Sequence, residues 1–293
     1  LPNDTNSDFL PLYHILLPIL KILYSLSYLL VSLYELQSTI CNIPPPHDTF
    51  CSLPSNLVTC ILHNLTSLCI VINSPCPTLA QLQAYDVPVA VNFTQASGAA
   101  LTDLLVAQER GDMGTVLGVD IVVTYPDRPR QWQKDADWLR FRAEGGMTRE
   151  VISHFLFFTE RVLGPLSLAS AHTTYPDDPS LCETAVLARL TSGTGQQVSI
   201  LATIGGAQPD RQEFTVKGTK TSRRVTDFHK DAISDGGDFI ALREPPQDPR
   251  AISLKAQLDD LSLHLAAKPN RLATMEEAFR IQTLVESILA KTL

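Results

Sequence analysis

Glycine, alanine, arginine and methionine are all missing from the start of this chain of 293 residues. Their first occurrences are Ala80, Gly98, Arg110 and Met113. Without glycine, residues 1–97 cannot contain the G-x-G-x-x-G turn that lets a backbone approach the pyrophosphate of a dinucleotide. The start of the chain therefore carries no recognisable signature of a dinucleotide-binding domain.

Charge is also scarce in this region. Residues 1–80 hold only five charged side chains, at Asp4, Asp8, Lys21, Glu35 and Asp48. Five of the six cysteines lie there as well, at Cys41, Cys51, Cys60, Cys69 and Cys76. We interpret residues 1–77 as an atypical segment rich in Leu, Ser, Pro and Cys, and not as a recognisable domain. A wrong reading frame, an intron or an incorrect gene structure would explain so abrupt a change of composition.

The apolar run over residues 9–36 leaves a membrane anchor as an alternative, because about 20 apolar residues span a bilayer. Lys21 near its middle costs about 2.5–3.5 kcal/mol on insertion scales, and Pro11 and Pro18 interrupt the run. The run has no basic region before it and is too long for a signal peptide. We therefore do not expect membrane association, although residues 9–36 are the segment that could provide it.

The formal net charge is −8, and no basic stripe is present, which argues against nucleic-acid binding. The cysteines form no C-x-x-C pair, so neither a zinc site nor a redox dithiol is indicated, and we propose no metal site. Cys182 is the only cysteine beyond residue 80 and suits a reduced, cytoplasmic protein.

From residue 87 onward, strand and helix signals alternate normally. Strands are predicted at 115–125, 165–174, 182–191, 197–204, 212–218 and 222–226, with short polar turns that favour antiparallel neighbours. Helices are predicted over 248–265 and 274–290, the second capped by Thr274. This order predicts an α+β fold, in which an open, mainly antiparallel β-sheet with helices on one face follows the atypical apolar segment.

A glycine turn that opens a helix is the most informative motif. Gly145 and Gly146 precede Thr148, which is predicted to cap the helix and to place Glu150 in its first turn. His154 lies four residues after Glu150, on the same helix face. An imidazole beside a carboxylate can take a proton from an alcohol. The alternatives are a core histidine and an ordinary acid at a helix start.

This motif resembles the C-terminal catalytic domain of the glucose–fructose oxidoreductase, inositol dehydrogenase and MocA family (Gfo/Idh/MocA). Gly145-Gly146 match the family's glycines, Glu150 takes the position of its aspartate, His154 matches its histidine, and Leu163-Gly164 match the helix end. The resemblance spans residues 78–293. It implies that residues 78–97 are a remnant of the end of a Rossmann domain and that residues 98–293 form the substrate and oligomerisation domain.

The resemblance also implies site residues. His154 and Glu150 are the expected catalytic pair, and Asn92 and Thr94 lie where the family places residues near the nicotinamide. Arg142, Arg149 and Trp132 are candidates for binding substrate, although a solvated face for the arginines and a loop anchor for the tryptophan are the alternatives. The family's catalytic lysine precedes a proline, whereas here Ser74 precedes Pro75.

The resemblance thus implies an oxidoreductase that uses NAD or NADP and acts on a sugar, a cyclitol or a related secondary alcohol or ketone. Loss of the cofactor-binding domain is expected to leave cofactor binding weak and turnover low. A homo-oligomer formed through the open sheet face is implied by the resemblance. The alternative is a non-catalytic dimerisation or ligand-binding module, the product of a truncated or incorrectly assembled gene.

Overall fold

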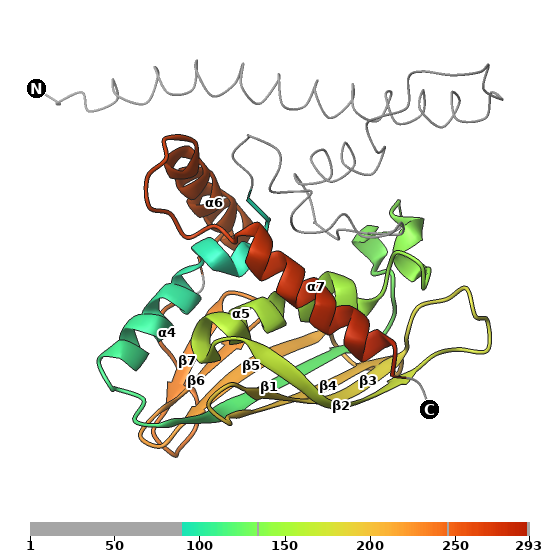
Figure 1. Cartoon of the computed structure of the whole chain (residues 1–293), viewed down its shortest axis with the longest axis horizontal. Coiled ribbons are helices and arrows are strands. Elements are labelled where there is room, and N and C mark those ends of the chain that lie inside the picture. The colour runs from blue at the N-terminus through green and yellow to red at the C-terminus, as the bar shows by residue number, and fades with distance from the viewer. Residues whose placement is uncertain (1–89, 134, 245, 292–293) are drawn as a thin grey trace, which may run out of the picture. The chain divides into compact units, whose positions relative to one another are not determined.

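A computed structural model describes residues 90–133, 135–244 and 246–291 of the chain (Figure 1). The predictions for residues 1–77, including the membrane alternative at 9–36, lie outside these described residues. Within the described ranges, no helix is both long enough and apolar enough to cross a bilayer.

One eight-stranded sheet forms the base of the fold, with strand order β2-β3-β4-β1-β5-β6-β7-β8. All neighbouring strands are antiparallel except β1 and β4, which are parallel. The strands are β1 Val116–Tyr125, β2 Leu166–Thr174, β3 Ala185–Ser192, β4 Gln197–Ile204, β5 Arg211–Gly218, β6 Ser222–Thr226, β7 Lys230–Ser234 and β8 Ile240–Ala241. The six predicted strands are confirmed, whereas β7 and β8 were not predicted, because both are short and lack clear alternation.

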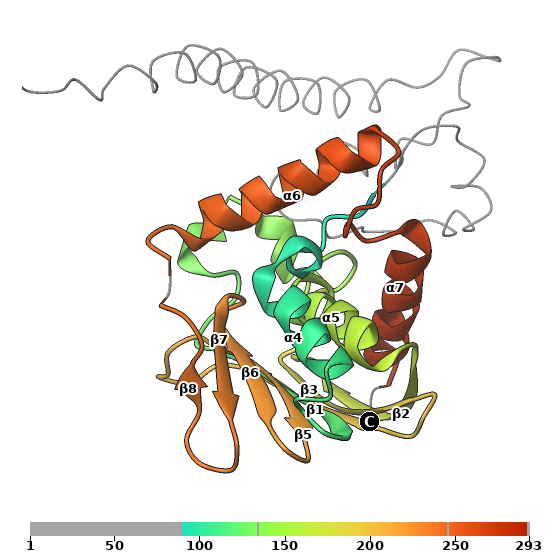
Figure 2. The same cartoon turned by 90° about the vertical axis from the view of Figure 1, so that its left-hand side faces the viewer.

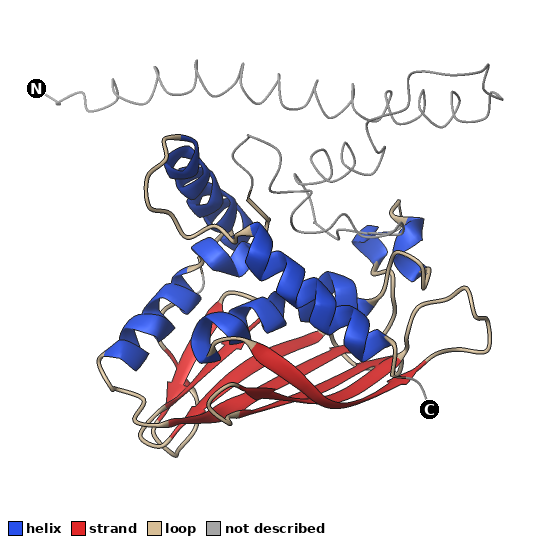
Figure 3. Cartoon of the chain, in the orientation of Figure 1, coloured by secondary structure: helices blue, strands red, loops and turns tan. Residues whose placement is uncertain are grey.

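Helices cover one face of this sheet only, as Figures 2 and 3 show. The covering helices are α4 Ala99–Glu109, α5 Ser153–Leu163 and α7 Met275–Leu289. Between the layers, Phe214 of β5 stacks with Phe158 of α5 at 4.4 Å between ring centres. The predicted α+β fold is therefore confirmed for the described residues.

The uncovered face presents a row of apolar side chains. Leu187 of β3 pairs with Leu201 of β4, which pairs in turn with Val122 of β1. Leu187 is 51% exposed and Leu201 is 43% exposed. This open face is the surface through which the sequence predicts oligomerisation.

The helix ends follow the local sequence. Helix α5 ends at Leu163, and its C-cap Gly164 has a φ of 79°, a backbone conformation that glycine adopts without steric cost. Helix α7 begins with a capping box between Thr274 and Glu277, as predicted. Helix α6 (Pro249–Leu265) begins at Asp248, whose side chain accepts a hydrogen bond from the Ala251 amide.

The chain enters the described region through a single β-bridge. Val91 pairs with Ala273 in this bridge. A short 3-10 helix, η2 (Thr94–Ser97), follows at once and contacts both α4 and α6. Strand pairing cannot continue here because the backbone turns into η2 beside the start of α4.

Candidate functional site

Close backbone approach explains the glycine pair. A Cβ atom on Gly145 would lie 2.1 Å from the carbonyl oxygen of Leu139. Gly146 has a φ of 108°, and a Cβ atom there would lie 2.5 Å from Oε2 of Glu183. Both contacts are far shorter than van der Waals packing permits, so the turn requires glycine at both positions.

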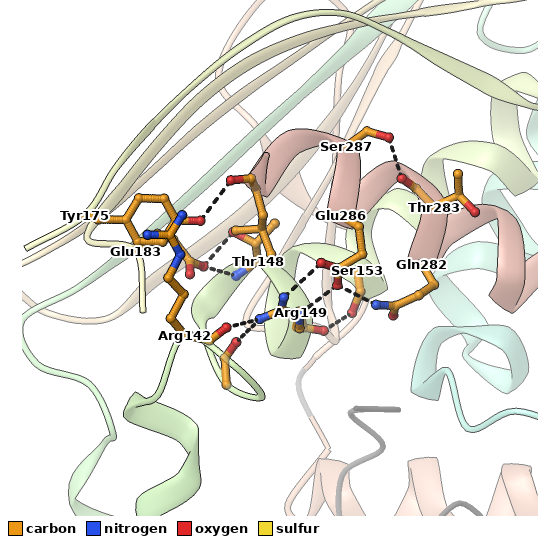
Figure 4. Close-up of polar contacts among 12 residues, drawn as sticks. Arg142, Thr148, Arg149, Ser153, Tyr175, Glu183, Gln282, Thr283, Glu286 and Ser287 are labelled. Atoms are coloured by element: carbon orange, nitrogen blue, oxygen red, sulfur yellow. Dashed lines mark hydrogen bonds and ion pairs between the residues drawn. The ribbon is translucent and has the colours of Figure 1, made fainter. Parts of the chain in front are cut away.

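Glu183, which the sequence analysis missed, holds the start of the helix in place. It is only 1% exposed and accepts hydrogen bonds from the backbone amide of Thr148 at 2.7 Å and from its Oγ1 at 2.6 Å (Figure 4). The prediction that Thr148 caps the helix is therefore wrong, because its hydroxyl donates to Glu183. Thr148–Ile152 form a π-helical turn, η5, before α5 begins. No local pattern reveals Glu183, because it lies 35 residues from Thr148.

Glu150 lies in this π-helical turn and is bound by a neighbouring loop. Its carboxylate accepts a hydrogen bond from Nε2 of Gln133 at 2.5 Å and forms ion pairs with Arg128 and with Arg130, the latter at 3.6 Å. The side chain is 7% exposed. The carboxylate is thus fixed and neutralised, which fits a positioning role better than proton transfer.

His154 lies in the first turn of α5, against two aromatic rings. The ring centre of Phe93 is 5.3 Å away in an edge-on arrangement, and that of Phe228 is 6.5 Å away. Nδ1 is fully buried and has no hydrogen-bond partner among the described residues. Burial lowers the pKa of His154 to about 4, so the imidazole is neutral at pH 7 and able to accept a proton.

The predicted cofactor segment lies beside this histidine. Phe93, which contacts the His154 ring, is flanked by Asn92 and Thr94. The Asn92 carbonyl Oδ1 and the Gln95 amide Nε2 are buried, with no hydrogen-bond partner in the part of the chain that the structure describes. Thr94 donates from Oγ1 to the Gln95 side-chain oxygen at 3.1 Å. The segment that contains Phe93, the ring neighbour of His154, therefore holds an unpartnered amide acceptor and an unpartnered amide donor.

The three candidates for substrate binding have other contacts. Arg149 forms two hydrogen bonds with the Glu286 carboxylate, at 2.8 and 2.9 Å, and donates to the carbonyl oxygens of Arg142 and Gly145 (Figure 4). Arg142 is exposed and its guanidinium lies 3.7 Å from the ring centre of Tyr175. Trp132 is 59% exposed, with Arg130 4.8 Å from its ring centre. Arg149 therefore ties the glycine turn to α7, while Arg142 and Trp132 stay accessible.

Because the folded state lowers the pKa of His154 below its ordinary 6.5, we expect this residue to make stability depend on pH. Between pH 6.5 and 4 the unfolded chain binds a proton that the folded chain excludes, so the free energy of unfolding falls as the pH falls. Relative to the wild type, His154→Gln should gain about 2–3 kcal/mol between pH 7 and pH 4. Urea unfolding of both proteins at several pH values measures this difference. A difference that does not change with pH would show that His154 is not buried as the structure has it.

The described residues contain no cluster of three His, Cys, Asp or Glu side chains that could hold a metal ion. Cys182 is buried as a free thiol, and burial raises its pKa to about 11, so it is not a reactive thiolate.

No protein-family model matches this sequence, and no curated protein matches it either. Solved structures do match the fold. The WlbA dehydrogenase from Bordetella pertussis, in complex with NADH and UDP-GlcNAcA, gives a TM-score of 0.55 at 20% identity, covering 71% of this chain and 63% of that one. A 3-ketoreductase from Actinomadura kijaniata, in complex with NADP and TDP-benzene, gives 0.57 at 16% identity, with coverage of 73% and 65%.

A UDP-N-acetylglucosamine 3-dehydrogenase from Acidithiobacillus ferrooxidans gives a TM-score of 0.53 at 15% identity, with coverage of 72% and 63%. The chain therefore spans less than two thirds of the length of these structures. They are Gfo/Idh/MocA-type oxidoreductases, and the match falls on their C-terminal domain region. The predicted resemblance is thus confirmed at the level of the fold.

Proposed function

We propose that this chain provides the substrate domain of an NAD(P)-dependent oxidoreductase of the Gfo/Idh/MocA type, acting on a secondary alcohol or ketone of a sugar or cyclitol. The observation that carries the proposal is His154, neutral and with an unpartnered Nδ1, in contact with Phe93 of the segment that holds the buried, unpartnered amides of Asn92 and Gln95. The fold is shared with structures that hold NADH or NADP, which supports the same cofactors here.

The nicotinamide end of the cofactor fits the described residues. Its carboxamide needs one donor and one acceptor, and Gln95 Nε2 and Asn92 Oδ1 offer that pair. The Gly145-Gly146 turn does not offer a place for the pyrophosphate, because the Glu183 carboxylate lies against it. NAD(P), when bound, would accept or supply the hydride.

In this mechanism His154 accepts the proton of the substrate hydroxyl as hydride leaves the carbon. Because burial lowers its pKa to about 4, the imidazole is neutral at pH 7, but it is a weaker base than a histidine that titrates near that pH. Glu150, held by Gln133 and two arginines, orients the turn that carries His154. The lysine of the family pattern has no counterpart in the sequence, so slow turnover is expected.

A non-catalytic role remains the second candidate, and the open sheet face favours it. The row formed by the exposed Leu187 and Leu201 and the half-buried Val122 is suited to burial against a second copy of the chain. A homo-oligomer formed through this face is compatible with either function. We also keep the prediction of a cytoplasmic location.

Replacing His154 with glutamine is expected to lower any NAD(P)-dependent oxidation of a sugar or cyclitol by about 100- to 10,000-fold. The measurement is NADH or NADPH formation by the full chain, alongside a fluorescence titration with each reduced cofactor. His172→Gln, on the open face, is the matched control and should retain the activity. Weak cofactor binding is expected, whereas tight binding would contradict the predicted loss of the cofactor domain. Equal rates for wild type and His154→Gln would refute the role of His154.

A further inference from the structure

A buried cluster of charge lies beside Glu150, where strand β1 ends. The guanidinium groups of Arg128 and Arg130 lie over the ring of Tyr125, 5.4 and 4.9 Å from its centre. Both arginines form ion pairs with the Glu150 carboxylate. The side chain of Arg128 is 2% exposed and that of Arg130 is 16% exposed, so water screens this cluster poorly.

The guanidinium of Arg128 has unused hydrogen-bonding capacity. Nη2 forms an ion pair with Glu150, but Nε, Nη1 and Nη2 are all buried and have no hydrogen-bond partner among the residues that the structure describes. A buried donor on a charged group destabilises the folded protein when it is unsatisfied. An acceptor that reached these nitrogens would therefore form strongly favourable hydrogen bonds with them.

The two guanidinium groups share one directly paired buried carboxylate, that of Glu150. A second buried carboxylate, that of Glu183, acts on Arg128 without forming an ion pair with it. Asp210 lies 4.0 Å from Arg130, but it is 44% exposed, and water weakens such a pair. The planar guanidinium fork of Arg128 matches the oxygens of a carboxylate or a phosphate.

We propose that Arg128 and Arg130 form an oxyanion subsite that binds a carboxylate or phosphate group of the sugar substrate. Glu150 is the internal counter-ion, which the bound group displaces in part. The assignment to the substrate rests on the function proposed above. Through Glu150 the subsite is joined to the turn that leads to His154, so it would fix the charged end of the substrate near the proton acceptor. The substrate is then an anionic sugar derivative and not a neutral polyol.

Calorimetric titration of the full chain tests this subsite without requiring turnover. The probes are D-glucuronate for a carboxylate, glucose 1-phosphate for a phosphate, and D-glucose as the uncharged control. We expect saturable binding of at least one anion and none of glucose. Arg130→Met should weaken the binding about tenfold, since it removes one charge-assisted hydrogen bond. Arg140→Met removes an exposed arginine, paired with Asp137, and should leave the affinity unchanged.

Glu150→Gln gives a second test, in which the anion affinity should change in the opposite direction to that in Arg130→Met. The substitution removes the competing carboxylate and frees the Nη1–Nη2 edge of Arg128, so anion affinity should rise about fivefold. A purely structural ion pair would lower stability in this variant and leave anion affinity unchanged. Circular dichroism confirms that each variant is folded before titration.

Binding that is the same in the wild type, Arg130→Met and Glu150→Gln would overturn the subsite, as would binding of glucose as strong as that of the anions. The two proposals fail separately. Oxidation of a neutral sugar without anion binding would contradict the proposed subsite but support the proposed function. If the affinities shift as expected but the chain shows no NAD(P)-dependent turnover, the subsite is supported and the proposed function is contradicted.

Discussion

Gly145→Ala is expected to destabilise the protein by about 3 kcal/mol or more, the effect of forcing a methyl group into a fully packed site. The new Cβ would meet the carbonyl oxygen, carbon and Cα of Leu139 at 2.1, 2.3 and 2.6 Å. These atoms are backbone and cannot rotate away. The carbonyl of Gly145 also accepts from Arg149, so a shift of the turn would strain the link to α7.

Urea unfolding, followed by circular dichroism, measures this loss against a matched control. Gly193→Ala is that control, since a Cβ atom there meets nothing within 4 Å and its φ is not in the left-handed region. Its free energy of unfolding should change by less than about 0.5 kcal/mol. Equal stability of Gly145→Ala and the wild type would mean that Leu139 does not approach the turn as closely as described.

This site separates what local sequence determines from what it does not. The ends of α5 and α7 were predictable because Gly164, Thr274 and Glu277 act on backbone groups within a few residues. The glycine pair was also recognised, but its physical cause was not. Its cause is the approach of Leu139 and Glu183, which only the folded chain brings together.

The partners of the predicted catalytic pair show the same limit. Glu150 and His154 share a helical segment, and their spacing suggests one shared ligand. In the structure Glu150 is bound by Gln133 and Arg128, from a loop whose conformation no periodic pattern specifies. The parallel pairing of β1 with β4 also could not be predicted from the sequence, since consecutive strands with short turns favour antiparallel neighbours.

The second large effect is expected at Arg128. Arg128→Met keeps the apolar stem but leaves the carboxylate of Glu150, 7% exposed, without its closest cation. Removing one partner of a buried ion pair typically costs about 3–5 kcal/mol, because the remaining charge stays buried. Arg130, 3.6 Å away, and the hydrogen bond from Gln133 remain, so the lower half of this range is expected.

The double variant Arg128→Met/Glu150→Gln should recover much of this loss. A glutamine at position 150 can still accept the hydrogen bond from Gln133 and carries no charge that needs a partner. Urea unfolding of the wild type, the two single variants and the double variant gives the coupling free energy of the pair. We expect the double variant to be more stable than Arg128→Met alone by about 1–3 kcal/mol. Additive losses would instead mean that Arg128 stabilises the loop by packing on Tyr125, and that the charge of Glu150 is tolerated without it.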